Sequence, residues 1–362
     1  MKTKVQALFF ITYLCFLQLV ILTISKHGAI LIASSNSYYN YRHQANVASM
    51  YQVLNKRGIN QKNIITVFYD DIANNPENPK PGTIVMKPGG ENMYLGLSKD
   101  YIGQQVVPHN VLKLLRGDNM TGIGSEKHIT TLDQLVIYIT GPTQPHTLFF
   151  WNKEILHAED LLGAIIDLYD SGRVKEILII MEASFSGSFF DGAIPQDKKI
   201  FAITAASPHQ GSGSCDFYEQ YSSTFLSSCF SKHINNFLIT EITNSTIIKD
   251  LLIQVKNETK TSSVCTYGDH STTEKKTSEY FGIIESKNGG DDDDDDDDAA
   301  KITQQELSAE ICYQKYKPSN NCMKKIISAY INAHGNFAEH NKYYIEKFIR
   351  NLCIDSAKKN VN

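Results

Sequence analysis

The stretch "EILIIMEASFSGSFF", residues 176–190, decides the fold and points to a site. Its apolar run, residues 177–181, ends at Glu182 and gives way to small residues that include Ser184. Such a run is typical of a strand buried on both faces, and the small residues permit a tight loop at the rim of the sheet. Open α/β folds place their sites at this rim. The stretch therefore predicts a central strand and a reactive loop, whose hydroxyls need a partner elsewhere in the chain.

Four more apolar runs have the same character. They are "GAILIAS" (28–34), "IITVFY" (64–69), "LVIYIT" (135–140) and "IFAITAA" (200–206). Helical patterns occupy residues 45–56 and 159–169, a longer one covers 239–255, and the three prolines of residues 74–84 predict a loop. Strands that alternate with helices predict an α/β fold, an αβα sandwich with a mostly parallel sheet.

The composition is that of an ordinary globular protein. Of the 362 residues, 42% are hydrophobic and 20% are charged. Eight of the 39 acidic residues form one run, Asp291 to Asp298, and the rest of the chain has 35 basic against 31 acidic residues. Lys and Arg are scattered without a basic stripe, so the sequence predicts no nucleic-acid partner.

The N-terminal segment indicates the compartment. Lys2 and Lys4 precede an apolar stretch, residues 5–24, and small residues near Thr23 could serve a signal peptidase. We predict that residues 1–25 are a signal peptide and that the protein enters the secretory pathway. The stretch is also about long enough to cross a bilayer, so an uncleaved anchor stays open as the alternative. Only in that case would the protein contact a membrane.

Secretory export affects how the cysteines and sequons are interpreted. An oxidising compartment permits disulfides among the six cysteines beyond the signal, but their pairing does not follow from the sequence. They are Cys215, Cys229, Cys265, Cys312, Cys322 and Cys353. None of their spacings resembles a zinc site, and we predict no metal and no cofactor. Sequons at Asn119, Asn244 and Asn257 are candidate glycosylation sites.

Two further segments follow the main domain, which we place at residues 26–285. Residues 286–300 are predicted to be an extended acidic linker, because eight like charges repel one another. A calcium site or a site for a basic partner is the alternative for this run. Residues 301–362, with ten basic and five acidic residues, are predicted to form a small all-helical C-terminal domain. This tail is too short for much core of its own, so we expect it to pack on the first domain.

Five blocks of sequence resemble the legumain family, the asparagine-specific cysteine endopeptidases of lysosomes and vacuoles. These blocks are "NYRHQANVASMYQVL" (40–54), "FYDDIANNPENPKPGTI" (68–84), "KDYIGQQVVPHNVLKLLRGD" (99–118), "EASFSGS" (182–188) and "TAASPHQGSGSC" (204–215). The resemblance implies a caspase-like αβα sandwich, and the helical tail looks like a shortened legumain prodomain. It also implies a mechanism in which a thiolate attacks the carbonyl after Asn, a His handles the proton and backbone N–H groups hold the oxyanion.

The chain departs from this family at both catalytic positions. The family's nucleophile follows Glu-Ala, where this chain has Ser184, and the family's His lies in Asp-His-Gly, where this chain has Gly141, Pro142 and Thr143. A proline side chain cannot carry a proton. A serine depends on a positioned base more than a cysteine does, and the two catalytic groups act as a unit. We therefore predict that the chain does not cleave peptides.

One local histidine could restore a base. His146 lies four residues beyond Pro142 and would reach Ser184 only if the loop were remodelled. The simpler interpretation is a surface histidine, and Ser186 and Ser188 are then small residues that allow a tight loop. An error in the sequence at 141–147 would leave Ser184 unexplained.

The family's specificity pocket is kept in part. The resemblance implies that Arg42 and Glu182 hold the side chain of a substrate asparagine. The pocket's third member, an Asp in the family, falls at Ser228 if one residue is inserted near Ser222. Asn40 and His43 are also kept, although they could simply tie the first loop to the sheet. We expect a pocket that persists with altered preference.

The sequence therefore favours a secretory or lysosomal pseudoenzyme that binds peptides or proteins, with active legumain relatives among the candidate partners. The alternative is an active asparagine-specific endopeptidase that uses Ser184 with an unconventional base. The Arg-Gly-Asp tripeptide at 116–118 is expected to be idle on the surface, and Asn288 is a candidate processing site for an active legumain.

Overall fold

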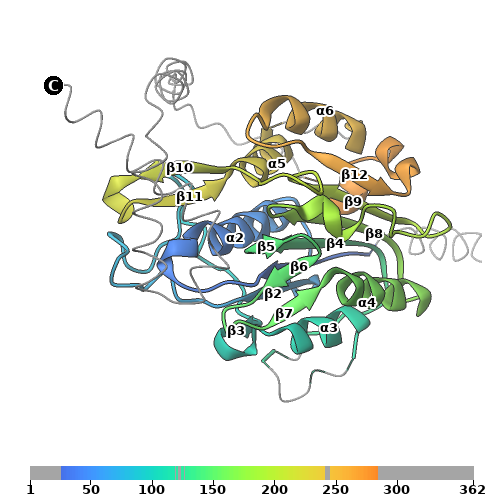
Figure 1. The fold of residues 1–362 in the computed structure, drawn as a ribbon, viewed down its shortest axis with the longest axis horizontal. Helices are drawn as coiled ribbons and strands as arrows, with labels where there is room; N and C mark the ends of the chain where they lie inside the picture. Colours follow the sequence, from blue (N-terminus) through green and yellow to red (C-terminus); the bar gives the residue numbers. More distant parts are fainter. Residues whose placement is uncertain (1–25, 119, 121–123, 126, 241–244, 284–362) are drawn as a thin grey trace, which may run out of the picture. The chain divides into compact units, whose positions relative to one another are not determined.

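The computed structural model describes residues 26–283 apart from 119, 121–123, 126 and 241–244 (Figure 1). Its main element is a seven-stranded sheet in the order β12-β9-β8-β4-β1-β2-β3. The strands are β1 (His27–Ala33), β2 (Ile64–Phe68), β3 (Tyr101–Ile102), β4 (Leu132–Thr140), β8 (Val174–Glu182), β9 (Ile200–Thr204) and β12 (Cys265–Gly268). Every neighbouring pair is parallel except β12 with β9, so the prediction of a mostly parallel sheet is confirmed.

Helices cover both faces of this sheet. The helices are α2 (Tyr41–Lys56), α3 (Pro108–Arg116), α4 (Ala158–Asp170), α5 (Cys229–Thr240), α6 (Ile248–Glu258) and the short α7 (Ser278–Phe281). Buried residues of α2, α5, α6 and α7 pack in one hydrophobic core, and those of α3 and α4 pack in a second core. Figure 1 shows α3 near α4 and α5 near α6, which are contacting pairs. The layers confirm the predicted αβα sandwich.

The alternation of side chains along β8 assigns its residues to these two cores. Leu178 and Ile180 belong to the core with α2 and α5, whereas Ile177 and Ile179 belong to the core with α3 and α4. Successive residues of a strand point to opposite faces. Glu182, two residues beyond Ile180, therefore falls on the α2–α5 side of the sheet.

Smaller elements connect these strands and helices, and the sequence analysis did not predict them. They are the hairpin of β10 (Ser214–Tyr218) and β11 (Thr224–Ser228), the three-stranded sheet of β5 (Thr143–Gln144), β6 (Thr147–Phe149) and β7 (Ile155–His157), and the 3-10 turns at Tyr38–Asn40, Gln61–Asn63, Gly103–Gln105, Ser186–Phe189, Glu219–Tyr221 and His270–Glu274. Strands this short carry too little periodicity to be recognised in a sequence.

One disulfide, Cys215–Cys229, joins the start of β10 to the start of α5. Cys265 is a free, partly exposed thiol. The other three cysteines considered for pairing lie outside the described residues.

The predicted elements compare well with the observed ones, with one exception. The five predicted strands, the loop at 74–84 and the helices at 45–56 and 159–169 are confirmed, although α2 begins four residues earlier, at Tyr41. The single helix predicted over 239–255 is wrong. Helix α5 ends at Thr240, and Ile247 forms a β-bridge with Lys276 before α6 begins. Because a backbone bonded to another segment cannot continue a helical ladder, the pattern splits into two helices.

Several sequence-based predictions lie outside the described residues: the signal peptide (1–25), the acidic linker (286–300), the helical tail (301–362) and Asn288. Within the described residues, no helix is long and apolar enough to span a bilayer.

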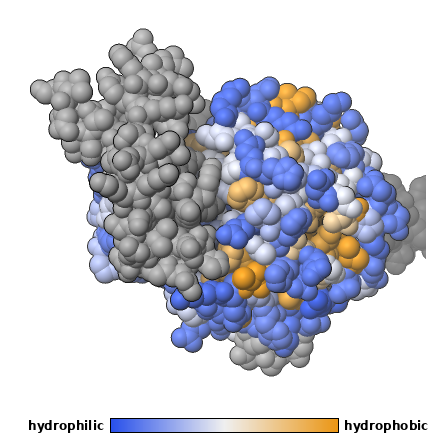
Figure 2. Space-filling view, viewed as in Figure 1, coloured by the Kyte–Doolittle hydropathy of each residue, from blue (hydrophilic) through white to orange (hydrophobic). Residues whose placement is uncertain are grey.

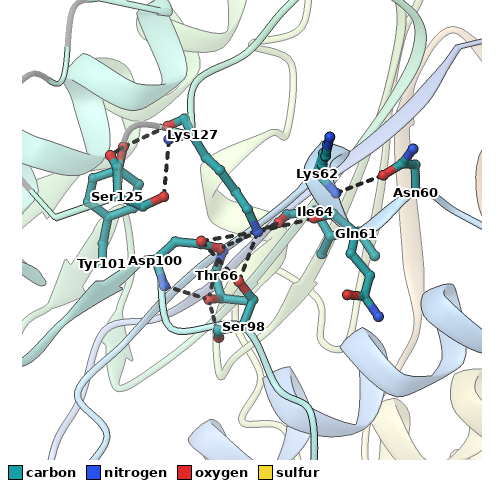
Figure 3. A network of polar contacts seen from close by, with 10 residues as sticks. All are labelled: Asn60, Gln61, Lys62, Ile64, Thr66, Ser98, Asp100, Tyr101, Ser125 and Lys127. Atoms are coloured by element: carbon teal, nitrogen blue, oxygen red, sulfur yellow. Dashed lines mark hydrogen bonds and ion pairs between the residues drawn. The ribbon is translucent and has the colours of Figure 1, made fainter.

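The outer strands of the sheet are held by the lysine network drawn in Figure 3. Lys127 Nζ donates to Ser98 Oγ at 2.8 Å and to the carbonyl of Ile64 at 3.0 Å, and it pairs with the carboxylate of Asp100 at 3.1 Å. Asp100 in turn accepts the backbone N–H of Thr66 in β2 at 3.0 Å. A buried carboxylate that is both paired and hydrogen-bonded is well satisfied. The network fastens β2, β3 and the segment around residue 127, so we assign it a structural role.

The surface offers no large apolar face in the view of Figure 2, where hydrophobic residues gather in small, separate patches among hydrophilic ones. Among the residues that the structure describes, the most exposed large hydrophobic side chain is Leu95, at 77%, followed by Ile253 at 54% and Tyr39 at 51%. They belong to a loop, to α6 and to the turn before α2. Hydrophobic side chains scattered in this way are normal on a monomeric protein.

Candidate functional site

The residues singled out by the sequence come together at the carboxyl ends of β1, β4 and β8. Thr140 at the end of β4 is the register partner of Glu182 at the end of β8. Pro142 and Ser184 each follow two residues later, so the sheet brings the family's base position and nucleophile position side by side. The hydroxyl of Thr143 donates to the backbone carbonyl of Ser184 and joins the two loops directly.

Ser184 is fully buried, at 0% exposure. Its Oγ accepts the backbone N–H of Ser212 at 3.1 Å. A backbone N–H cannot take up a proton, whereas a serine nucleophile must give its proton to a base. This contact therefore does not activate Ser184.

The loop that carries the base in the family is a structural hairpin in this chain. Pro142 leads into β5, its carbonyl accepts the N–H of Phe149, and Thr143 pairs with Leu148 across to β6. Thr143 is 4% exposed and is bonded to the nucleophile loop. Position 142 lies where the base belongs, and its residue has no proton to exchange.

His146, the local candidate for a base, is a surface residue. It lies at the exposed tip of the β5–β6 hairpin with a positive φ of 60°. Its backbone N–H donates to Ser188 Oγ at 2.8 Å, and its carbonyl accepts the N–H of Ala158 at 2.9 Å. Both backbone groups are therefore fixed with the ring on the surface, whereas Ser184 is fully buried. The interpretation of His146 as a surface histidine is supported.

Ser186 and Ser188 have structural contacts. Ser186 Oγ accepts the N–H of Ala206 at 3.1 Å, and Ser188 Oγ donates to the carbonyl of Phe185 at 2.7 Å. Phe185, at the start of this turn, has a φ of 57°. The two hydroxyls satisfy backbone groups in a tight turn, as the sequence predicted.

Gly141 occupies a position with no room for a side chain. A Cβ built there would lie 2.0 Å from Ser34 Oγ and 3.0 Å from Leu148 Cδ1. Ser34 is itself buried and donates to the carbonyl of Phe149 at 2.7 Å, so it cannot move away without losing that bond. An acidic residue at 141, as in the family, would clash with Ser34 in this chain.

We expect Gly141→Ala to lower the free energy of unfolding by about 1–3 kcal/mol, because overpacking forces neighbours to shift. Gly163→Ala is the matched control. Gly163 lies in α4, where a Cβ added to it would meet no atom within 4 Å, so alanine there should raise stability by roughly 0.5–1 kcal/mol. Urea denaturation of the two variants measures both effects, and equal stability of the two would contradict the packing account.

Asn40 and His43 make contacts with the loop that follows β1. Asn40 Nδ2 donates to the carbonyl of Asn36 at 3.1 Å, which ties the loop after β1. His43 is buried, and its Nδ1 lies 2.7 Å from Ser35 Oγ. Burial, and then the charge of Arg42, hold the pKa of His43 well below its ordinary 6.5, so the ring is neutral.

Arg42 and Glu182 are the two charged residues that the resemblance assigns to the specificity pocket. Arg42, in the first turn of α2, is 8% exposed, and Glu182 is 2% exposed. Burial raises the pKa of Glu182 from 4.5 to about 7, although bonds from Ser212 and Ser231 and the charge of Arg42 lower it in part. The structure therefore brings the predicted Arg–Glu pair together, in a buried setting where ionisation of the carboxyl is costly.

Ser228, at the position of the family's third pocket residue, is hydrogen-bonded to α2. Asn46 Nδ2 donates to Ser228 Oγ at 2.9 Å, and Asn46 Oδ1 accepts the N–H of Ser228 at 3.3 Å. Both groups are buried. Position 228 thus adds no charge to the pocket and packs against the helix that carries Arg42.

Four site residues were missed by the sequence analysis: Asn46, Tyr138, Ser212 and Ser231. Asn46 lies one helical turn after Arg42, and that i, i+4 spacing could have placed it on the same face. The others come from a strand, a loop and a helix, and their contacts depend on the tertiary fold. No local pattern marks them.

Of the three sequons, only Asn257 lies within the described residues. Its side chain is exposed near the end of α6, as a glycan requires. Asn119 and Asn244 fall in the gaps. No group of three His, Cys, Asp or Glu side chains suited to a metal occurs in the described parts of the chain. The Arg-Gly-Asp tripeptide ends α3, where Arg116 pairs with Asp167 at 3.2 Å.

Comparison with known proteins identifies the family. Legumain from Rattus norvegicus is 36% identical over 263 residues, which cover 71% of this chain and 60% of that protein, and legumain from Homo sapiens is 35% identical over the same shares. The beta-isozyme of vacuolar-processing enzyme from Arabidopsis thaliana is 37% identical over 192 residues, 52% of this chain and 40% of that protein. The chain thus spans about three fifths of the length of the legumains that it matches.

Among solved structures, caspase-1 from Spodoptera frugiperda matches with a TM-score of 0.41 and 11% identity, over 67% of this chain and 87% of that one. The sequence model of the Peptidase C13 family matches residues 27–285. Together with the legumain matches, this shows that the chain is a member of the Peptidase C13, or legumain, family.

Proposed function

We propose that this chain is a proteolytically inactive legumain relative that binds peptides or proteins through the retained part of an asparagine pocket. One observation carries the proposal. Pro142 and Ser184 each follow two residues after the register pair Thr140 and Glu182, in loops joined by the bond from Thr143 to Ser184, and the proline supports the proposal because it cannot accept a proton there. Without sulfur at 184 and without a base at 142, attack on an amide carbonyl has neither of its two main catalytic groups.

The pocket supports binding. Arg42 and Glu182 lie close enough for the arginine to lower the pKa of the carboxyl, and both are buried at the carboxyl edge of the sheet. A guanidinium offers donors to an amide oxygen, and a carboxylate accepts from an amide nitrogen. The pair is therefore suited to the primary amide of asparagine.

The compartment is part of the same proposal. The basic and apolar N-terminus, the exposed sequon at Asn257 and the disulfide Cys215–Cys229 favour the secretory pathway. Similarity to a vacuolar-processing enzyme favours a lysosome or vacuole as the destination, with the extracellular space as the other candidate. Active legumain relatives are candidate partners there, and membrane contact would require an uncleaved segment 1–25.

Calorimetric titration with a short asparagine-containing peptide tests the binding claim. We expect the natural protein to bind the peptide intact, and Arg42→Ala to weaken binding at least about 30-fold, because it leaves a buried carboxyl without its cation. Arg116→Ala is the matched control, since that arginine is exposed in its pair with Asp167 and lies on α3. Equal affinity of the natural protein and Arg42→Ala, or an absence of binding to the natural protein, would contradict the proposal.

A further inference from the structure

A set of buried polar contacts lies behind the pocket, between α2, β4 and α5. Asn235 Nδ2 donates to Ser49 Oγ at 2.8 Å, and Tyr138 Oη lies 2.5 Å from Ser231 Oγ. All four side chains are less than 5% exposed. Polar groups in such a setting are expensive to bury and are normally retained with their partners.

Two of these groups, Tyr138 and Ser231, form a series of hydrogen bonds that ends at Glu182. Ser231 hydrogen-bonds the carboxyl of Glu182 and also contacts Tyr138. When Glu182 is ionised its carboxylate can only accept, so in that state Ser231 donates to Glu182 and accepts from Tyr138. Burial, and then the charge of Glu182, raise the pKa of Tyr138 well above 10, so the phenol keeps the proton that it donates.

These hydrogen bonds leave one carboxylate oxygen of Glu182 without a partner. Among the described residues, Glu182 Oε2 is buried and accepts no hydrogen bond, so the bonds from Ser212 and Ser231 fall on the other oxygen. An unsatisfied buried carboxylate oxygen is costly and is rare in folded proteins. A ligand that brings an N–H donor to this atom would relieve that cost.

We propose that Ser231 and Tyr138 are positioning residues of the pocket, which hold one oxygen of Glu182 so that Oε2 faces the N–H donor of a primary amide. The identity of the ligand rests on the proposed function. The positioning itself is a property of the protein alone.

The groups that face Glu182 determine how it titrates. Arg42 approaches from α2, Tyr138 from β4, Ser231 from α5 and Ser212 from the loop after β9. Arg42 is the charged member of this set. Loss of the Ser231 hydroxyl removes a bond that favours the ionised carboxylate, so the pKa of Glu182 must rise in Ser231→Ala.

The experiment follows the side-chain carboxyl of Glu182 by carbon-13 NMR titration of the full-length protein, with Glu182→Gln to assign the signal. We expect Ser231→Ala to move the midpoint upward by about one pH unit, Tyr138→Phe to move it less in the same direction, and Ser231→Thr to restore it. Ser49→Ala is the matched control, because it removes a buried hydroxyl from the same helix interface without touching Glu182. An unchanged midpoint in Ser231→Ala, or an equal shift in Ser49→Ala, would overturn the proposal.

Binding of the asparagine peptide gives a second readout. At pH 7 a rise of one pH unit reduces the ionised fraction of Glu182 from about half to about a tenth, so the affinity should fall about five-fold in Ser231→Ala. If the natural protein binds no such peptide, the proposed function fails, while the NMR midpoints still decide whether Ser231 and Tyr138 hold Glu182. If Ser231→Ala does not fold, Tyr138→Phe decides the positioning claim by the same titration: a raised midpoint supports it and an unchanged one overturns it.

Discussion

The double variant Pro142→His/Ser184→Cys is expected to cleave an asparagine-containing fluorogenic peptide at a rate at least about 100-fold above either single variant. A positioned general base contributes roughly 10²–10⁴-fold, and nucleophile and base act as a unit, so neither change alone should suffice. The expectation follows from the sheet. Thr140 and Glu182 are register partners, and positions 142 and 184 lie two residues beyond them along the chain. An imidazole at 142 would therefore lie near a thiol at 184.

The assay would compare the two single variants and the double variant from about pH 4 to 7, with a folded-state check by circular dichroism. A double variant that folds and binds the peptide but does not cleave it would contradict this expectation. It would mean that the loop has been rebuilt beyond two positions. Thr143, whose hydroxyl is bonded to the carbonyl of Ser184, would then be the next residue to change, with Thr143→Gly restoring the family's third residue.

The natural protein should lose about 3 kcal/mol of its free energy of unfolding between pH 4.5 and 7.5 through Glu182, and Glu182→Gln should abolish this loss. The pKa of Glu182 is raised in the folded protein from 4.5 to about 7, mainly by burial. Between these two values the folded state holds a proton that the unfolded state has already released, so the free energy of unfolding falls as the pH rises. A pKa raised by this amount corresponds to about 3 kcal/mol, all of it lost by pH 7.5. Glutamine cannot ionise, so this loss disappears in the variant.

Urea denaturation at several pH values between 4.5 and 8 measures this effect, and Glu176→Gln is the matched control on the same strand. Burial alone would raise the pKa of Glu176, but bonds from Lys275, Tyr280 and Lys199 outweigh it and lower the pKa below its ordinary value. Its contribution to stability is therefore present at neutral pH and lost in acid, the opposite sign. The change in the free energy of unfolding between pH 4.5 and 7.5 is compared between the natural protein and Glu182→Gln. An equal change in both proteins would contradict the burial of Glu182.

Most of the sheet could be predicted from the sequence, because its central strands are buried on both faces and appear as unbroken apolar runs. Residues 177–181 and 135–140 are the clearest cases, and both became strands next to each other in the sheet. The helix predicted at 239–255 failed because apolar spacing does not reveal that Ile247 bonds to a segment almost thirty residues away. The short strands β5 to β7 carry no periodic signal at all.

The site divides in the same way. Arg42, Glu182, Pro142 and Ser184 could be identified from motifs, since each lies within a recognisable block of sequence. The contacts that decide their behaviour could not, because they come from positions distant in the chain. Ser231, for instance, reaches Glu182 only because α5 packs behind β8.

The departures from the family fit the packing around them. Gly141 lies against Ser34, and Thr143 uses its hydroxyl to bond the nucleophile loop. Residues at these two family positions thus contribute packing and a hydrogen bond to the fold.

The most direct measurement is the turnover of an asparagine-containing fluorogenic peptide by the purified natural protein from about pH 4 to 7, next to Ser184→Ala. We predict that neither protein cleaves the peptide above background. Ser184 Oγ accepts a hydrogen bond from the backbone amide of Ser212, and the family's base position, residue 142, is a proline. Cleavage by the natural protein that is abolished in Ser184→Ala would contradict the account.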